Sequence, residues 1–326
     1  MRNSTTGSVA LAMVEPVAPI PAVHSLDGFT LMVPDLDQAQ EFYSAFGLAV
    51  DRAGDRLLLR THGDQHVWAD LVQGPRKRLL SIRFGIYEAD RAAFAERLAD
   101  VRDTEKQTQE DGAIWLTAPD GLSVEVAVAP KTSPDAKASF GVPPRHDPHR
   151  GAGPRGKAAR ITPRRLSHIS LFTTDLGRAI DFYGNYLGLR LSDRSGGDVA
   201  FLHGAHGSEH HMIAFGRSNG TGLHHSSWDV PSVADVGQGA MQMRDAGYAR
   251  GWGVGRHVLG SNYFHYVRDP WGSYAEYSAD MDYIPSGQIW VAGDHPAEDS
   301  FYQWGPEPPE DFGTNHEIDG ASADSR

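Results

Sequence analysis

The chain repeats itself, and this internal duplication limits the possible fold more than any other feature of the sequence. Residues 167–176 match residues 27–36 position by position. A Phe-Tyr pair then follows at residues 182–183 in the second copy and at residues 42–43 in the first. Because a repeat of this kind marks a structural unit, we expect two copies of a unit of about 130 residues to fold alike.

Each copy has the pattern of a strand, a helix and then further strands. Asp35 stands where a helix N-cap is expected, and apolar residues follow it at helical spacing. Aromatic and β-branched runs bounded by turn residues indicate strands. In the first copy the expected strands are residues 29–33, 56–61, 67–72, 79–86, 114–117 and 123–128, and a second helix is expected at residues 90–101.

The composition changes sharply between the two copies and again after the second. The connecting stretch is rich in Pro, Gly and basic residues and has no periodicity, so we expect a surface linker. The aromatic part of the tail is expected to pack on the body, and residues 315–326 to be frayed. The expected divisions are an extended N-terminal arm at 1–23, a first domain at 24–130, the linker at 131–160, a second domain at 161–284 and the tail at 285–326.

Charge and cysteine content exclude several classes of protein. The chain of 326 residues has no cysteine, which excludes disulfides and thiol nucleophiles and suits a reducing compartment such as the cytoplasm. A formal net charge of −12 argues against nucleic acid and anionic membranes as partners, since both attract basic patches. No apolar run approaches the roughly 20 residues of a membrane helix, and a proline-broken N-terminus argues against a signal peptide.

One carboxylate stands in the middle of an aromatic hairpin near the end of the second copy. Residues 262–268 and 273–278 read as two strands joined by the turn at residues 269–272. Alternation places Glu276 on one face together with Tyr274 and Ser278. A buried carboxylate is unfavourable unless it is paired or binds a metal, so Glu276 is either exposed at a sheet edge or part of a site.

Two histidine-bearing strands favour the second alternative. His168 shares a face with Ser170 and Phe172, and the strand at residues 223–229 carries His224 and His225, of which strict alternation lets only one face inward. Two histidines and one carboxylate from separate strands form the ligand set of a non-haem Fe(II) site.

The first copy provides an internal control for this interpretation. It has Gly28 at the position of His168 and Ser81 at that of His225, and only Glu125 matches Glu276. If the histidines served the fold alone, both copies should tolerate similar residues there. We therefore expect a metal in the second copy only.

These motifs resemble the vicinal oxygen chelate superfamily and, within it, the type I extradiol catechol dioxygenases. The resemblance covers roughly residues 24–284 and is most specific at residues 166–176, 223–228 and 255–277. It is nearest to the catechol 2,3-dioxygenase and homoprotocatechuate 2,3-dioxygenase groups. It implies an α+β fold in which duplicated βαβββ modules form two open barrel domains, with a metal in the second domain and a vestigial first domain.

The resemblance also implies roles for individual residues. It makes His168, His225 and Glu276 the ligands of Fe(II), with Mn(II) possible as a replacement. His211, from a His-x-aliphatic-Ala segment, is expected to serve as the acid/base, and His257 and Tyr266 to hydrogen-bond the substrate oxygens. The ordinary alternatives are a solvated loop for His211, a core aromatic for Tyr266 and a core histidine for His257.

The expected reaction is extradiol ring cleavage of a catechol by dioxygen. Homoprotocatechuate enzymes carry an Arg five residues before the histidine of their Gly-Arg-His segment, and here that position is Trp252. We therefore expect an apolar substituent or none, with Trp252, Phe201 and Leu259 as pocket walls and Ser170 as a further substrate contact. The resemblance also implies a homo-oligomer, with a tetramer favoured.

The same fold supports two other functions. A metal-dependent isomerase or thiol transferase usually takes ligands from both units, and Gly28 and Ser81 remove that option. A non-catalytic resistance-type protein that sequesters an aromatic compound needs no ligand triad, so the triad argues against it.

Overall fold

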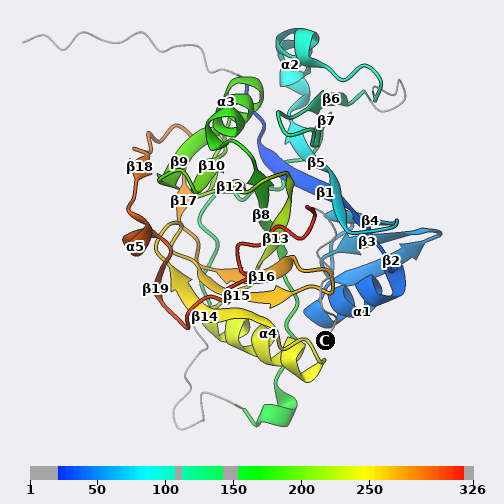
Figure 1. Ribbon diagram of the computed structural model, residues 1–326, viewed down its shortest axis with the longest axis vertical. Coiled ribbons are helices and arrows are strands. Elements are labelled where there is room, and N and C mark those ends of the chain that lie inside the picture. Colours follow the sequence, from blue (N-terminus) through cyan, green and yellow to red (C-terminus); the bar gives the residue numbers. More distant parts are fainter. Residues whose placement is uncertain (1–20, 107–111, 142–152, 319–326) are drawn as a thin grey trace, which may run out of the picture.

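The computed structural model describes residues 21–106, 112–141 and 153–318, and it confirms the duplicated α+β architecture (Figure 1). Of the expected N-terminal arm, only residues 21–23 fall within this part. The first unit consists of β1 (Ser25–Val33), α1 (Leu36–Phe46), β2 (Ala49–Ala53), β3 (Arg56–Arg60), β4 (Ala69–Gln73), β5 (Arg78–Ile86), α2 (Arg91–Arg97), β6 (Ile114–Thr117) and β7 (Ser123–Val128), with short 3₁₀ turns at Glu88–Asp90 and Ala99–Val101.

The second unit follows the same order and adds the strand β14 and several short elements. A 3₁₀ turn at Arg155–Lys157 precedes it. Its main elements are β8 (Arg165–Thr173), α3 (Leu176–Leu187), β9 (Arg190–Ser195), β10 (Val199–His203), β12 (Ile213–Arg217), β13 (Gly222–Asp229), α4 (Val233–Asp245), β14 (Gly251–His257), β15 (Tyr263–Arg268) and β16 (Tyr274–Ala279). The additions are β11 (Ser208–Glu209), β17 (Tyr283–Ile284), β18 (Gly293–Asp294), α5 (Ala297–Ser300) and β19 (Tyr302–Trp304).

The two units build sheets with the same strand order. The first is β2-β3-β4-β1-β5-β7-β6, and the matching part of the second is β9-β10-β12-β8-β13-β16-β15, extended by β18 at one edge and by β14 and β19 at the other. A small separate sheet pairs β11 with β17. In this arrangement β8, β13 and β16 are neighbours in the middle of the second sheet, where side chains from all three can meet (Figure 1).

The helix after the first strand begins and ends in the same way in both units. Asp35 caps α1 by accepting from the backbone N–H groups of Asp37 and Gln38, and Asp175 caps α3 by accepting from that of Arg178. Each helix ends at a glycine with positive φ, 100° at Gly47 and 73° at Gly188. The matching cap sequences therefore set similar helix lengths, 11 residues for α1 and 12 for α3.

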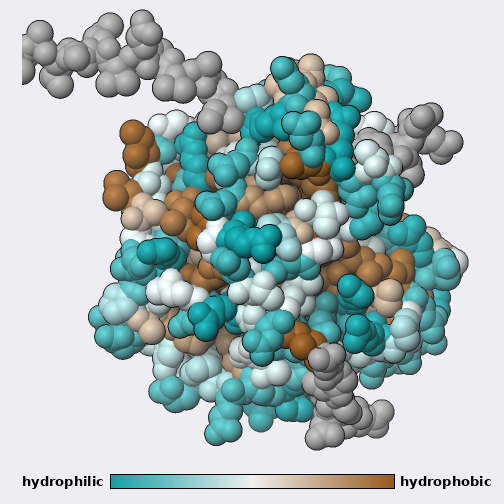
Figure 2. All heavy atoms as spheres, turned by 45° about the horizontal axis from the view of Figure 1, so that its top comes forward, coloured by the Kyte–Doolittle hydropathy of each residue, from teal (hydrophilic) through white to brown (hydrophobic). Residues whose placement is uncertain are grey.

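Contacts between the two units bury aromatic side chains. The rings of Phe46 on α1 and Tyr277 on β16 stack with centroids 3.9 Å apart, and the Tyr277 hydroxyl donates to the Phe46 carbonyl. On the other side of the molecule Arg97 of α2 donates to the carbonyl of Tyr186 on α3. The face drawn in Figure 2 is mostly hydrophilic, with separate hydrophobic patches. No helix among the described residues is long and apolar enough to cross a membrane.

The tail is ordered further than the sequence suggested. The expectation of fraying from residue 315 is wrong for residues 315–318, because Asn315 donates to the carbonyls of Gly220 and Thr221 and Glu317 pairs with Lys77 at 3.0 Å. Both partners of that ion pair are buried, so each compensates the charge of the other. Residues 319–326 lie outside the described part.

The linker runs along the surface of the second unit. Lys137 pairs with Asp280 at 2.9 Å, and the Gly141 N–H donates to the Pro231 carbonyl at 2.8 Å. These contacts fit the expected surface course, although residues 142–152 lie outside the described part.

Two buried histidines away from the candidate site predict a pH-dependent stability. Burial lowers the pKa of His203 and of His265 to about 4. The unfolded chain then binds more protons than the folded chain between about pH 6.5 and pH 4. As the pH is lowered from about 6.5 to about 4, we expect the free energy of unfolding of the metal-free protein to fall by about 1.4 kcal/mol per pH unit for each histidine. Above about pH 6.5 these two histidines should cause no further change in stability. Urea unfolding at a series of pH values tests this, and equal stability at pH 7 and pH 5 would contradict it.

Candidate metal centre

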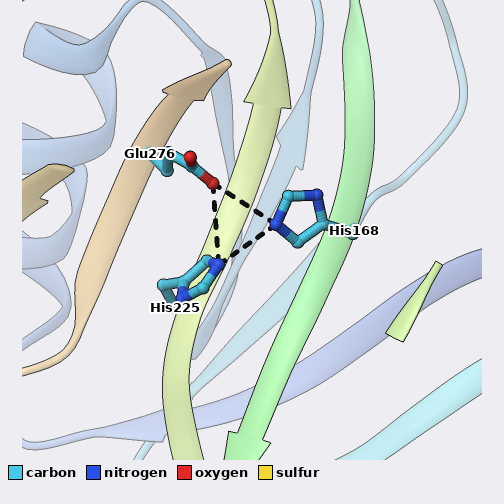
Figure 3. Close-up of side chains that lie close together, drawn as sticks. All are labelled: His168, His225 and Glu276. Atoms are coloured by element: carbon cyan, nitrogen blue, oxygen red, sulfur yellow. Dashed lines mark hydrogen bonds and ion pairs between the residues drawn. The ribbon is translucent and has the colours of Figure 1, made fainter. Parts of the chain in front are cut away.

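Three neighbouring strands bring His168, His225 and Glu276 together (Figure 3). Ser227 on β13 pairs with His168 on β8 and with Glu276 on β16, and His225 lies two residues before Ser227 on the same face. The Nε2 atoms of the two histidines are 3.1 Å apart. Oε2 of Glu276 lies 3.3 Å from Nε2 of His168 and 3.6 Å from Nε2 of His225. Among the described residues, this is the one group of three such ligand atoms within metal-binding distance.

The carboxylate of Glu276 has one buried oxygen without a hydrogen-bond donor, facing the two histidines. Glu276 is fully buried; its Oε1 accepts from Asn262 Nδ2 at 3.2 Å, but its Oε2 has no hydrogen bond. Burial opposes ionisation, yet the contact with His168 and the nearby His257 keep the pKa of Glu276 below its ordinary value. A buried, ionised oxygen without a donor is costly, and a divalent metal bound to Oε2 and the two Nε2 atoms removes that cost.

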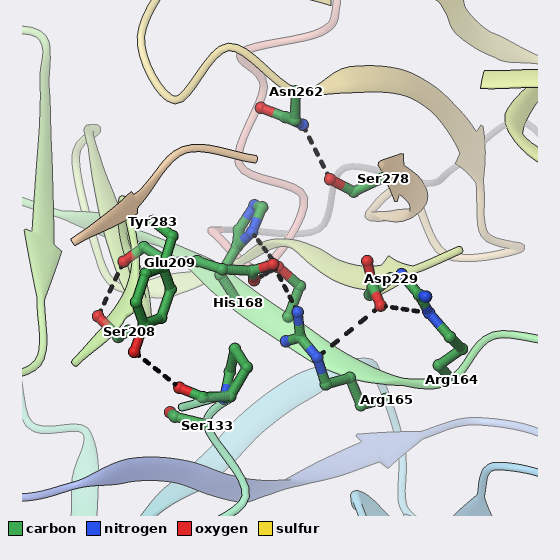
Figure 4. Close-up of polar contacts among 12 residues, drawn as sticks. Ser133, Arg164, Arg165, His168, Ser208, Glu209, Asp229, Asn262, Ser278 and Tyr283 are labelled. Carbon is green, nitrogen blue, oxygen red and sulfur yellow. Dashed lines mark hydrogen bonds and ion pairs between the residues drawn. The ribbon is translucent and has the colours of Figure 1, made fainter. Parts of the chain in front are cut away.

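A buried polar network behind His168 fixes which of its nitrogens faces the site (Figure 4). Ser167 donates its hydroxyl proton to Glu209 Oε2 at 2.6 Å and lies 3.2 Å from His168 Nδ1. The hydroxyl therefore accepts from Nδ1–H of His168, which leaves the lone pair of Nε2 for a metal. Arg165 holds Glu209 in an ion pair at 2.5 Å.

Loss of the Ser167 hydroxyl should weaken metal binding without removing a ligand. In Ser167→Ala the Nδ1–H of His168 loses its acceptor, and we expect an affinity for Mn(II) about 10- to 100-fold lower. Ser208→Ala is the matched control, because Ser208 is also buried but bonds to Gly204 N and to the Glu209 carbonyl instead. Isothermal titration with Mn(II) measures both, and equal affinities in the two variants would contradict the role of Ser167.

His224 and His225 both face inward, whereas the sequence predicted that only one of them would. His224 also orients His225 through a hydrogen bond between the two rings. A register irregularity between Leu223 and His225 in the β13–β8 pairing interrupts the alternation, and both histidines line the same cavity. Nδ1 of His225 lies 2.6 Å from Nδ1 of His224, and Nε2 of His224 lies 2.8 Å from the Phe312 carbonyl. Strict alternation was the wrong rule at this position.

The equivalent place in the first unit contains a cation of its own. In the first unit Arg83 pairs across the sheet with Gly28 on one side and with Glu125 on the other. In the second unit Ser227 pairs in the same way with His168 and with Glu276, so Arg83 occupies the position of Ser227. The guanidinium of Arg83 donates to Asp27 at 2.6 Å. Arg83 thus stands where the second unit has the small Ser227, and Gly28 and Ser81 stand where it has the two histidines, so the arrangement of side chains in the second unit is not repeated here.

A cavity of about 370 Å³ opens beside the three side chains. Its walls include all three expected acid/base and hydrogen-bonding residues, His211, His257 and Tyr266. The other wall residues are largely apolar. They include the predicted Phe201, Leu259 and Ser170, together with Phe172, Ala214 and Gly216.

Trp252 is not among the cavity walls, contrary to the sequence-based expectation. Its ring is buried behind Tyr266, stacked at 5.5 Å and 12°, and its Nε1 donates to the Pro306 carbonyl. An Arg at this position would place its charge in an aromatic cluster rather than against a substrate. The expected preference for an apolar substituent must therefore rest on other residues.

His211 is held with a lone pair available toward the cavity. His210 Nε2 donates to Asp193 at 2.8 Å, and His210 Nδ1 lies 3.0 Å from Nδ1 of His211. Because His210 directs its Nε2 hydrogen at Asp193, its Nδ1 can accept from His211 Nδ1–H, which leaves the lone pair of His211 on Nε2. Burial lowers the pKa of His211 well below its ordinary value, and His168 and His210 lower it further. The His211 side chain is therefore neutral and can accept a proton.

Tyr266 and His257 form a directed hydrogen-bonded pair. His257 Nδ1 lies 2.8 Å from the Phe301 carbonyl, which can only accept, so Nδ1 carries the hydrogen. His257 Nε2 then accepts from the Tyr266 hydroxyl at 2.9 Å. Burial and the Glu276 charge raise the pKa of Tyr266 well above its ordinary value, so the hydroxyl stays protonated.

Several site residues were missed from the sequence. Strict alternation excludes His224 from the site. The contact of Asn262 with Glu276 depends on the geometry at the start of β15, which residue spacing does not reveal. Phe301 and Phe312 line the cavity although both lie in the tail, outside the resemblance. The aromatic run in the tail was the one available signal.

Comparison with known proteins is consistent with this geometry. The family model described as the glyoxalase/bleomycin resistance protein/dioxygenase superfamily matches residues 165–277. The chain is 50% identical over 299 residues to metapyrocatechase 2 of Cupriavidus necator, covering 91% of this chain and 93% of that protein. It is 26% identical over 270 residues to the manganese-dependent 2,3-dihydroxybiphenyl 1,2-dioxygenase of Geobacillus genomosp. 3, covering 74% and 79%.

A solved structure supports the fold independently of sequence. Homoprotocatechuate 2,3-dioxygenase of Brevibacterium fuscum, in complex with 3,4-dihydroxyphenylacetate, superposes with a TM-score of 0.70. The match covers 92% of this chain and 94% of that one at 20% identity. At this identity the likeness shows the shared fold alone.

Proposed function

The chain belongs to the extradiol dioxygenases of the glyoxalase/bleomycin resistance protein/dioxygenase superfamily, and we propose that it cleaves catechols with an apolar substituent at a metal bound by His168, His225 and Glu276. The observation that carries the proposal is the buried Glu276 oxygen without a donor, placed 3.3 Å and 3.6 Å from the Nε2 atoms of His168 and His225. Fe(II) is the proposed metal, because two histidines and one carboxylate are the ligand set of non-haem Fe(II) oxygenases; Mn(II) suits the same donors.

A bound divalent metal supplies Lewis acidity that lowers the pKa of a catechol hydroxyl, and open coordination positions for both substrates. The protein's own groups then manage protons. The lone pair of His211 Nε2 can accept a proton from the substrate and return it later. The Tyr266 oxygen can accept a hydrogen bond from a catechol hydroxyl while its own proton points to His257. Each group is aimed by a fixed partner, so little reorganisation is needed during the reaction.

The size and lining of the cavity favour a substituted ring. A cavity of roughly 150 Å³ accommodates benzene, and this one is about 370 Å³. Away from the ligands, Ala214 and Gly216 leave space along β12, and Phe172 and Phe201 line it. Alkyl or aryl substituents fit such a wall, whereas a carboxylate would be desolvated there unless Arg217 paired with it.

A substrate panel with one cavity variant tests this assignment. We expect kcat/KM for catechol, 4-methylcatechol and 2,3-dihydroxybiphenyl to exceed that for 3,4-dihydroxyphenylacetate. Gly216→Leu should fill the far end of the cavity, so that it retains cleavage of catechol but loses that of the aryl substrate.

Gly197→Leu is the matched control, because a side chain at Gly197 meets nothing closer than 3.9 Å. Preference for 3,4-dihydroxyphenylacetate would show that a cation such as Arg217, which also lines the cavity, binds the carboxylate. Equal losses in both variants would contradict the placement of the substituent. The homo-oligomeric state, with a tetramer favoured, and the cytoplasmic location remain predictions.

A further inference from the structure

The C-terminal tail contacts the proposed metal centre through its backbone as well as its side chains. The carbonyl of Phe312 lies 2.8 Å from His224 Nε2, and that of Phe301 lies 2.8 Å from His257 Nδ1. Both phenylalanine rings also line the cavity. Two histidines of the site are therefore bonded to a segment that follows the duplicated domains.

A carbonyl oxygen can only accept, and this fixes a chain of hydrogen positions. Nε2 of His224 must carry the hydrogen, so its Nδ1 has the lone pair in the neutral ring. That lone pair accepts from Nδ1–H of His225 at 2.6 Å. His225 is then left with its Nε2 lone pair directed at His168 and Glu276, as metal binding requires.

The tail is held in this position by contacts outside the site. Glu317 pairs with the buried Lys77 of the first unit and accepts from the backbone N–H groups of Leu79 and Leu223. Asp311 pairs with Arg268. Asn315 donates to the carbonyls of Gly220 and Thr221, just before β13. The anchors thus join the tail to both units and to the strand that carries His225.

We propose that residues 301–317 are a working part of the metal centre, in which the Phe312 carbonyl acts through the positioning residue His224 to hold His225 in its metal-binding tautomer. This inference rests on the proposed metal site. Because binding and tail docking share the bond between His224 and Phe312, each should strengthen the other by the same factor.

Mn(II) titration and hydrogen–deuterium exchange of the full-length protein test both directions of this coupling. His224→Phe removes the relay and should lower Mn(II) affinity by about 10- to 100-fold. His224→Gln, whose amide offers one acceptor and one donor, should restore most of it. Glu317→Gln and Asn315→Ala loosen the tail away from the metal and should lower the affinity by about 5-fold or more. Glu310→Gln, at an exposed tail position, should not change it.

The exchange measurement reports the reverse effect. Mn(II) should slow amide exchange of residues 311–318 in the wild type and in Glu310→Gln, but not in His224→Phe. Unchanged affinity in His224→Phe and Asn315→Ala, or tail exchange that ignores Mn(II), would overturn the coupling while leaving the metal centre intact. Absence of Mn(II) and Fe(II) binding in the wild type would instead overturn the proposed metal site.

Discussion

His225→Ala should bind no Fe(II) and show no ring cleavage, and His168→Ala and Glu276→Ala should behave alike. Each change removes one of three ligand atoms that lie within 4.8 Å of one another. Removal of Glu276 also leaves two buried imidazoles without the carboxylate charge that compensates a dication. Metal analysis after gel filtration and oxygen uptake with catechol measure the two losses separately.

The first unit provides the matched control for these variants. Glu125 is the residue of the first unit that corresponds to Glu276, because it pairs with Arg83 as Glu276 pairs with Ser227. Glu125→Ala therefore makes the same change outside the proposed site. It should keep a single iron per chain and full cleavage activity. Two metal ions per wild-type chain, or iron retained in any of the three ligand variants, would contradict the assignment.

His211→Phe should retain iron and bind catechol but turn over about 10²- to 10⁴-fold more slowly, the usual loss for a missing acid/base group. The side chain lines the cavity and is held by His210 rather than by the metal ligands, so the ligand set stays intact. Anaerobic catechol binding and single-turnover kinetics separate the two steps.

His206→Phe is the matched control for a lost imidazole, since His206 donates from Nε2 to the Ala22 carbonyl outside the cavity and its loss should leave turnover unchanged. Loss of iron in His211→Phe would show that this residue is needed for the metal site. Normal turnover in this variant would show that His211 is not the acid/base of the reaction.

The sequence predicted the fold because the duplication carries its own checks. The same aspartate cap and the same glycine end occur in both copies, and both produce the same helix. The identity of the ligand strands followed from comparing the copies, since Gly28 and Ser81 cannot replace two histidines. That comparison did not reveal Arg83, whose position between Gly28 and Glu125 depends on strand register.

What the sequence could not predict depends on departures from regular geometry or on contacts between distant segments. A local irregularity in β13 lets His224 and His225 share a cavity, which periodicity excludes. Trp252 matched a specificity position by spacing, but its ring packs behind Tyr266. The tail reaches the site only because Glu317 and Asn315 meet partners in distant parts of the chain.

Identification of the product from catechol under ¹⁸O-labelled dioxygen tests the central claim most directly. The Fe(II)-loaded protein should form the muconic semialdehyde that results from cleavage beside the diol, with both atoms of dioxygen incorporated before exchange with water. Formation of the dicarboxylic muconate, which results from cleavage between the two hydroxyls, or catechol binding without oxygen uptake, would contradict an extradiol dioxygenase.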